Sequence, residues 1–175
     1  MERLLTAQQI SQAIEQLYQA LRAQLPRQDL AVIGIRTRGE VLAQRLVERL
    51  RQDGLELRHG VLDITFYRDD LSLRKGVPVV KATEIDFSLD DQTVLLVDDV
   101  LATGRSVRAA LDALVDFGRP KAIRLAVLID RGGRELPIAA DYCGLRLLAP
   151  PGKRVQVHLK EPDGDDGAYL VEFAR

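Results

Sequence analysis

The chain has 175 residues and a mass of 19.5 kDa, and its 25 Lys and Arg against 26 Asp and Glu give a formal net charge of −1. Hydrophobic residues make up 46% and charged residues 29%, so we expect one globular domain over residues 1–175, and the single cysteine excludes a disulfide scaffold. An overall basic field for nucleic acid is also excluded, and the lack of a signal peptide or of any apolar run near the roughly 20 residues of a membrane span predicts a cytoplasmic protein with no membrane partner.

The first part of the chain alternates helical and strand patterns. Residues 6–25 carry apolar side chains at spacings of three and four, which predicts an amphipathic helix with Thr6 as its N-cap. The continuous apolar run 30–35 is typical of a strand that is buried on both faces. A polar turn over 36–39 then leads into a second helix that ends near Gln52.

In the middle of the chain, a stretch with little secondary-structure pattern is followed by a stretch with a clear one. Residues 57–66 read as a strand, and the charged stretch that follows, up to residue 91, favours a loop, although a short strand at 77–80 stays open. Residues 93–97 predict a buried strand and 105–117 a helix, whose apolar face includes Val115.

The last part of the chain is rich in strand patterns. An apolar strand is expected over 122–129, and shorter ones near 141–144, 155–159 and 168–173. The acidic stretch 161–167 lacks the ligand spacing of a calcium loop and reads as a solvated hairpin turn. Strands that alternate with helices predict an α/β fold with a doubly wound, mainly parallel sheet, in which ligands bind at the carboxyl edge.

The sharpest motif follows the most apolar strand in the middle of the chain. That strand delivers two adjacent carboxylates, Asp98 and Asp99, to the sheet edge, and Thr103, Gly104 and Ser106 follow at the start of a helix. Backbone amides at a helix start have no partner within the helix and attract anions, above all phosphate. Two acids beside a phosphate cradle suit a ligand with vicinal hydroxyls and a metal near its phosphate, and ribose 5-phosphate with Mg²⁺ meets that description.

The same segment, residues 94–106, resembles the phosphoribosyl pyrophosphate (PRPP) signature of type I phosphoribosyltransferases. Residues 34–39 resemble the pyrophosphate loop of that superfamily. Two further segments, 62–71 and 127–142, are similar to those of the PyrR family, whose members regulate pyrimidine operons and are also uracil phosphoribosyltransferases. The resemblance covers roughly residues 28–145 in the correct order.

This resemblance implies the type I phosphoribosyltransferase fold, in which helices flank the sheet. A small hood would be built from about residues 130–175 together with the N-terminal segment. A flexible lid loop would span about residues 67–85 and exclude water from the reaction. The segment 145–152 departs from the family pattern, and so does Ala102, where close relatives often carry an aromatic residue and purine-salvage relatives an acid.

The resemblance also implies roles for particular residues. Asp98 and Asp99 would hold the ribose hydroxyls and, through them, Mg²⁺, and with Arg38 they are the implied catalytic residues. Thr37 and Arg38 would bind the leaving pyrophosphate. The lid cations, Arg68 and Lys81, would close over it. The full set implied to bind PRPP or UMP is Thr37, Arg38, Arg68, Lys81, Asp98, Asp99, Val100, Leu101, Ala102, Thr103, Gly104, Arg105, Ser106, Arg131 and Val155.

The function implied is transfer of the phosphoribosyl group from PRPP to uracil, which yields UMP and pyrophosphate, together with UMP-dependent binding of pyrimidine-operon leader mRNA. The family's RNA face would include Arg134, yet the helix over residues 6–21 carries no Lys or Arg, so a transferase without RNA binding stays open. A nucleotide-sensing regulator with little turnover is a further alternative, and a purine or orotate transferase ranks lower. A homodimer or higher homo-oligomer is usual for the family.

Overall fold

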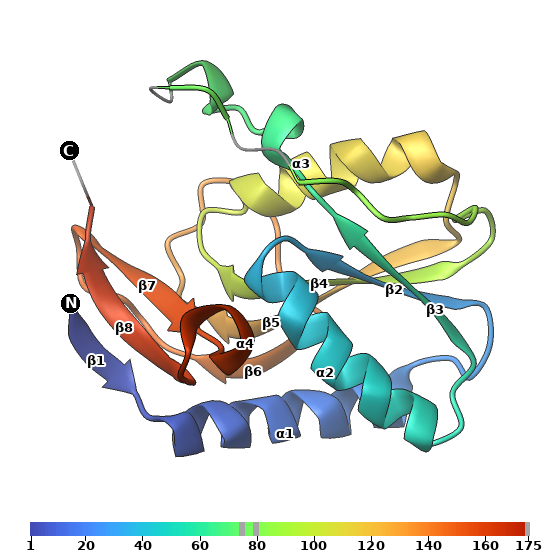
Figure 1. The fold of residues 1–175 in the computed structure, drawn as a ribbon, viewed down its shortest axis with the longest axis horizontal. Helices are drawn as coiled ribbons and strands as arrows, with labels where there is room; N and C mark the ends of the chain where they lie inside the picture. The colour runs from blue at the N-terminus through green and yellow to red at the C-terminus, as the bar shows by residue number, and fades with distance from the viewer. Residues whose placement is uncertain (74–75, 79–80, 174–175) are drawn as a thin grey trace.

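The computed structural model of the chain describes residues 1–73, 76–78 and 81–173, and its strands form two sheets (Figure 1). The larger sheet is built from five strands: β2 (Leu30–Ile35), β3 (Leu57–Leu62), β4 (Thr93–Leu101), β5 (Ala122–Asp130) and β6 (Tyr142–Arg146). All neighbouring pairs are parallel, in the order β3-β2-β4-β5-β6. The predicted doubly wound sheet is therefore confirmed.

Helices cover both faces of this sheet (Figure 1). The helices α1 (Ala7–Gln24) and α2 (Arg38–Gln52) lie on one face, and α3 (Arg105–Leu114) lies on the other. Thr6 caps α1 as predicted, since its side chain accepts from the amide of Gln9 in a capping box. The apolar strands pack into two cores, one on each face, and β2 is buried along its whole length.

The strand order reverses between β2 and β4, which are neighbours in the sheet. From β2 the chain winds outward to β3, and it then returns to the other side of β2 to form β4. The loops that leave the carboxyl ends of β2 and β4 therefore run in opposite directions and leave a crevice between them. This crevice receives residues 36–39 from one side and residues 98–104 from the other.

The second sheet is the hood, an antiparallel sheet in the order β1-β8-β7. Its strands are β1 (Glu2–Leu5), β7 (Lys153–His158) and β8 (Gly167–Glu172), and the four-residue helix α4 (Lys160–Asp163) joins the last two. The first and last strands of the chain thus lie side by side in the hood (Figure 1). Strand β1 was not expected from the sequence, whereas the predicted strands of the C-terminal part are confirmed to within a few residues.

Several boundaries differ from the predictions for local physical reasons. Strand β3 ends at Leu62 rather than at 66, because the Asp63 side chain accepts from the Thr65 amide and turns the chain. Strand β4 continues through both acids to Leu101, paired with β5. The side chain of Val115 is 74% exposed, so its assignment to the apolar face was wrong; the α-helix has ended at Leu114 and a 3₁₀ turn follows.

The proposed lid segment contains two short 3₁₀ turns, Thr65–Tyr67 at its start and Leu71–Leu73. Of the short strand left open at 77–80, residues 79–80 lie outside the described residues, as do residues 74–75 of the lid. Among the residues that the structure describes, no helix is long and apolar enough to span a membrane.

Candidate functional site

A cavity of about 330 Å³ lies at the crevice between β2 and β4. It collects residues from four separate parts of the chain, and eight of them belong to the set predicted from the sequence. These eight are Thr37, Arg38, Arg68, Lys81, Asp98, Asp99, Val100 and Ser106. A larger hollow of about 640 Å³ opens beside β3, but its lining includes Glu40, Glu84 and Asp86, and this acidic charge disfavours a phosphorylated ligand. The smaller cavity is therefore the candidate site.

Two carboxylates stand at the floor of the candidate site. Successive side chains of a strand point to opposite faces, so Asp98 and Asp99 leave β4 on different sides. Burial and the neighbouring Asp99 raise the pKa of Asp98 well above its usual range, and Arg68 opposes this rise. Burial likewise raises the pKa of Asp99, against the pull of Arg38. Each acid thus faces its own arginine, and the pair is poised to accept a cation or hydroxyl donors.

Two of the cations that line the site, Arg38 and Arg68, are held by protein carboxylates. Arg68 donates from Nε and Nη2 to Asp70 at 2.8 and 2.9 Å. Arg38 donates from Nε and Nη2 to Asp163 of the hood at 3.0 and 2.7 Å. Both guanidinium groups are therefore fixed in direction, although they also line the cavity.

Sequence reasoning missed a group of residues that ties the far end of the proposed lid to the site. The two carboxylate oxygens of Asp63 accept from the amides of Thr65 and Lys81, at 2.8 and 2.7 Å. Arg36 donates to the carbonyl oxygen of Ala82 at 2.9 Å and pairs with Glu84 at 3.2 Å. An Asp directly after an apolar strand, with Thr two residues later, is the local signal that could have pointed to Asp63.

The predicted phosphate loop, residues 101–106, runs from the end of β4 into the first turn of α3, with Gly104 at a φ of 93°. The following segment of the chain braces this loop. The amide of Arg131 donates to the Leu101 carbonyl at 3.0 Å, and two amides, of Glu135 and Leu136, donate to the Thr103 carbonyl. The loop is therefore held rigidly from one side, as a site that binds an anion through its backbone requires.

Arg134 is the centre of this bracing. Its guanidinium donates to the carbonyl oxygens of Ala102 and Ile138, at 2.9 and 2.8 Å, and to the Asp130 carboxylate at 2.6 Å. All three of its nitrogens are thus used within the protein, which the sequence did not indicate. Contact with RNA through Arg134 stays a prediction, and the structure adds a role in holding the phosphate loop.

We expect Arg134→Met to lower the free energy of unfolding by about 1 kcal/mol, because it leaves partly buried acceptors without their charged donor. Turnover should fall as well, since the Ala102 carbonyl loses its anchor. Urea denaturation and a measurement of KM for PRPP would check both effects. A stable variant with an unchanged KM would show that the bracing is dispensable.

The remaining predicted residues lie outside the cavity lining. The Arg105 side chain turns away from the cavity to Asp69 and Glu135, each at 2.6 Å. Val155 lies on β7 of the hood and its side chain is buried in the core, so any contact with a base would involve its backbone. These assignments stay predictions.

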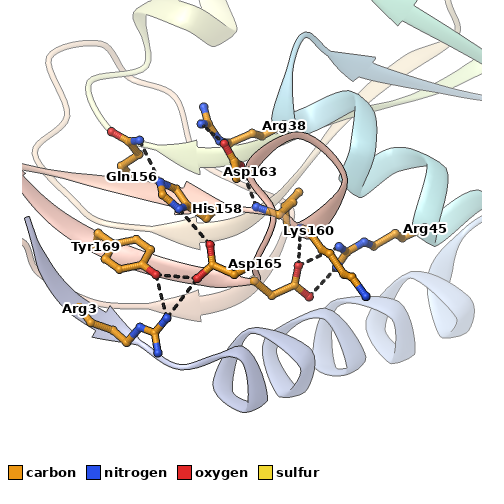
Figure 2. A network of polar contacts seen from close by, with 11 residues as sticks. Arg3, Arg38, Arg45, Gln156, His158, Lys160, Asp163, Asp165 and Tyr169 are labelled. Atoms are coloured by element: carbon orange, nitrogen blue, oxygen red, sulfur yellow. Dashed lines mark hydrogen bonds and ion pairs between the residues drawn. The ribbon is translucent and has the colours of Figure 1, made fainter.

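The turn between β7 and β8 is not the solvated hairpin that the sequence suggested. Three of its four acids pair with arginines of α2: Asp163 with Arg38 (Figure 2), and both Glu161 and Asp166 with Arg45. The fourth, Asp165, pairs with Arg3 of β1. The hydrogen bonds from Arg45 lower the pKa of Asp166. Burial pushes the pKa of Asp163 upward, but its hydrogen bonds with Arg38 and the Leu159 amide outweigh burial and leave it below its usual value of 3.8.

These lowered pKa values predict a loss of stability in acid. A carboxylate whose pKa is lower in the folded state stabilises the fold above its unfolded pKa, and this contribution disappears as the pH falls through the folded value. The free energy of unfolding should therefore decrease from about pH 5 to about pH 3, and less steeply in Asp166→Asn. Urea titrations at several pH values would measure both slopes, and equal slopes would contradict the assignment of this contribution to Asp166.

Within the described residues, no group of three or more His, Cys, Asp or Glu side chains could enclose a metal ion. The donor set at the site, the Asp98 and Asp99 carboxylates, consists of hard oxygen ligands. It fits Mg²⁺, which keeps water and substrate phosphates as most of its ligands.

A family model described as "Phosphoribosyl transferase domain" matches residues 1–161 of the chain. The chain is 48% identical to the Bifunctional protein PyrR of Deinococcus radiodurans over 171 residues, which cover 97% of this chain and 93% of that protein. It is 44% identical to the Bifunctional protein PyrR of Caldicellulosiruptor bescii, with 99% and 97% covered.

Solved structures of similar fold include a hypoxanthine-guanine phosphoribosyltransferase of Bacillus anthracis, with a TM-score of 0.71, 16% identity and 98% of each chain covered. A hypoxanthine phosphoribosyltransferase of Trypanosoma cruzi also has a TM-score of 0.71, at 17% identity, with 98% of this chain and 95% of that chain covered. At these identities the likeness concerns the fold alone. With the close relatives and the family model, it places the chain in the phosphoribosyltransferase family, as a member of the PyrR group.

Proposed function

We propose that this chain transfers the phosphoribosyl group of PRPP to uracil, forming UMP and pyrophosphate, and that it also regulates pyrimidine genes through UMP-dependent binding of leader mRNA. The observation that carries the enzymatic part is the cavity itself. It brings the Asp98–Asp99 pair, the start of α3 and the cations Arg38, Arg68 and Lys81 to one crevice, although the sequence spreads them over 69 residues, from 38 to 106. Carboxylates for a ribose, amides for one phosphate and cations for a second phosphate group match the parts of PRPP.

Mg²⁺ would be held by Asp98 and Asp99 together with the substrate's own oxygens, and when bound it neutralises charge on the pyrophosphate. This assignment rests on the hard oxygen donors and on burial, which makes the pair of charges costly without a cation.

Different residues of the chain would then bind the other parts of PRPP. The backbone of residues 101–106 would bind the 5-phosphate, and Thr37 and Arg38 would bind the pyrophosphate group. Arg38 would stabilise the negative charge that grows on this group as the bond to carbon 1 of the ribose breaks. Residues 67–85 would close over the cavity as a lid, with Arg68 and Lys81 facing the pyrophosphate, and would exclude water.

Regulation through RNA is supported by the close relatives, which are named bifunctional. In this chain three of the five N–H groups of Arg134 already donate within the protein, so at most two remain for RNA. We also propose a homodimer or higher homo-oligomer, as in the family, which light scattering would test.

The test is UMP formation from PRPP and Mg²⁺ with each nucleobase in turn, run beside gel retardation of a pyrimidine-operon leader RNA with and without UMP. Turnover that is specific for uracil would support the enzyme. UMP-dependent RNA retention without turnover would mean that the site acts as a sensor, and turnover with a purine would overturn the choice of substrate.

A further inference from the structure

The hood contributes a carboxylate to the candidate site from a part of the chain far from the PRPP motif. Figure 2 shows Asp163, at the end of α4, facing Arg38 at the start of α2. The Nε and Nη2 atoms of Arg38 donate to the two carboxylate oxygens at 3.0 and 2.7 Å, so the contact is bidentate. This geometry fixes the plane of the guanidinium as well as its position.

Asp163 is itself held firmly. Its Oδ2 accepts the backbone amide of Leu159 at 2.9 Å, and its side chain is only 13% exposed. An ionised, nearly buried carboxylate anchored to its own turn provides a rigid support for an arginine.

The contact leaves part of the guanidinium for a ligand. Arginine carries five N–H groups, and the contact with Asp163 uses one on Nε and one on Nη2. The edge formed by Nη1 and Nη2 can still fork onto two phosphate oxygens, and Arg38 lines the cavity beside Asp99. Asp163 also reduces the local positive charge. Its benefit to an anionic ligand must therefore come from the orientation that it gives to the Arg38 guanidinium.

We propose that Asp163 is a positioning residue: it orients Arg38 for the pyrophosphate group of PRPP and so couples the docking of the hood to substrate binding. This inference rests on the proposed function, in which Arg38 binds pyrophosphate. It adds a residue from outside every motif that the sequence analysis assigned to the site.

The chain offers a matched control in the same turn. Asp166 also accepts a backbone amide of the turn, that of Lys160 at 2.7 Å, and also pairs with an arginine of α2, Arg45. Asp166 and Arg45 are not among the residues that line the candidate site. Asp163→Asn and Asp166→Asn therefore remove the same charge and the same kind of ion pair, but only the first touches a residue of the site.

The experiment measures the Kd for pyrophosphate with Mg²⁺ by calorimetry, and kcat and KM for PRPP, in both variants. We expect Asp163→Asn to raise the Kd and the KM on the order of tenfold, since misdirected binding groups cost about this much. Asp166→Asn should change neither by more than about twofold. In an Arg38→Lys background, where the single ammonium cannot donate in the same bidentate way, Asp163→Asn should add less than about twofold.

Unchanged or tighter pyrophosphate binding in Asp163→Asn would overturn the proposal, as would equal weakening in Asp166→Asn. Should Asp163→Asn fail to fold, Asp163→Ser keeps an oxygen for the Leu159 amide, removes the carboxylate and is expected to show the same weakening; wild-type affinity there would also overturn the proposal. The binding measurement does not require turnover. A wild-type protein that binds pyrophosphate but forms no UMP would refute the proposed enzyme, while the comparison of variants would still decide the role of Asp163.

Discussion

Replacing Asp98 and Asp99 together with asparagine is expected to abolish UMP formation and to leave the protein folded. Asparagine keeps the shape of both side chains but removes the charge that would hold a ribose hydroxyl and a cation. Turnover should fall by a factor of at least about 10³, because preorganised charge of this kind is the main source of rate enhancement in such sites.

The fold should survive because the apolar strand β4, and not the acid pair, holds this part of the sheet. Burial raises the pKa of both acids, so their ionisation already costs stability in the protein without a bound cation. We expect the free energy of unfolding to lie within about 1 kcal/mol of the wild type. The matched control is Asp112→Asn on the outer surface of α3, which should keep full turnover. Near-normal turnover in a folded double variant would remove the pair from the site.

The second large effect is expected from Gly39→Ala, a change of one methyl group. A Cβ at residue 39 would lie 2.6 Å from the carbonyl oxygen of Val97 and 3.1 Å from the Cα of Asp98. Both atoms belong to the backbone of β4, so the start of α2 must move away and take Thr37 and Arg38 with it. We expect kcat/KM to fall about 100-fold and the free energy of unfolding to fall by about 2 kcal/mol.

The variant Gly144→Ala serves to separate the loss of activity expected of Gly39→Ala from its loss of stability. Its Cβ would meet the carbonyl oxygens of Ala13 and Leu128 at 2.7 and 2.8 Å, a clash of the same kind between α1 and β6, away from the cavity. A similar loss of stability is expected, with kcat/KM nearly unchanged. Steady-state kinetics and urea denaturation of both variants measure this contrast, and a comparable loss of kcat/KM in both would mean that lower stability alone explains Gly39→Ala.

Most of the sheet and half of the predicted site could be read from the sequence because their signals are local. The apolar run of β2 and the acid pair that follows the run of β4 need no distant partner to be visible. The parallel arrangement also follows from local patterns, since strands that alternate with helices form βαβ units whose loops lie at one edge. The acid pair was singled out by its local signal, whereas Thr37 and Arg38 were assigned from the resemblance of their segment to a known family, and the roles of all four stay predictions.

The contacts that were missed join residues far apart in the chain. Asp163 lies 125 residues from Arg38, and the sequence around it reads as an ordinary polar turn. Asp63 receives its second amide from Lys81, 18 residues away across the proposed lid. Strand β1 has four residues, too few for a clear period, and it exists because β8 pairs with it. Such features depend on tertiary packing, which local patterns do not contain.

The pairing of β1 with β8 has a consequence for the order in which the protein assembles. Arg3 and Asp165, which form an ion pair in the hood, are 162 residues apart, whereas the strands of the parallel sheet pair over much shorter separations. Closing so long a loop costs entropy that a preformed core can offset, so we expect β1 to pair with β8 late in folding. Asp163 and Arg38 are themselves 125 residues apart, so we expect this contact to form after the parallel sheet and its acid pair, and Arg38 to be oriented only at that point.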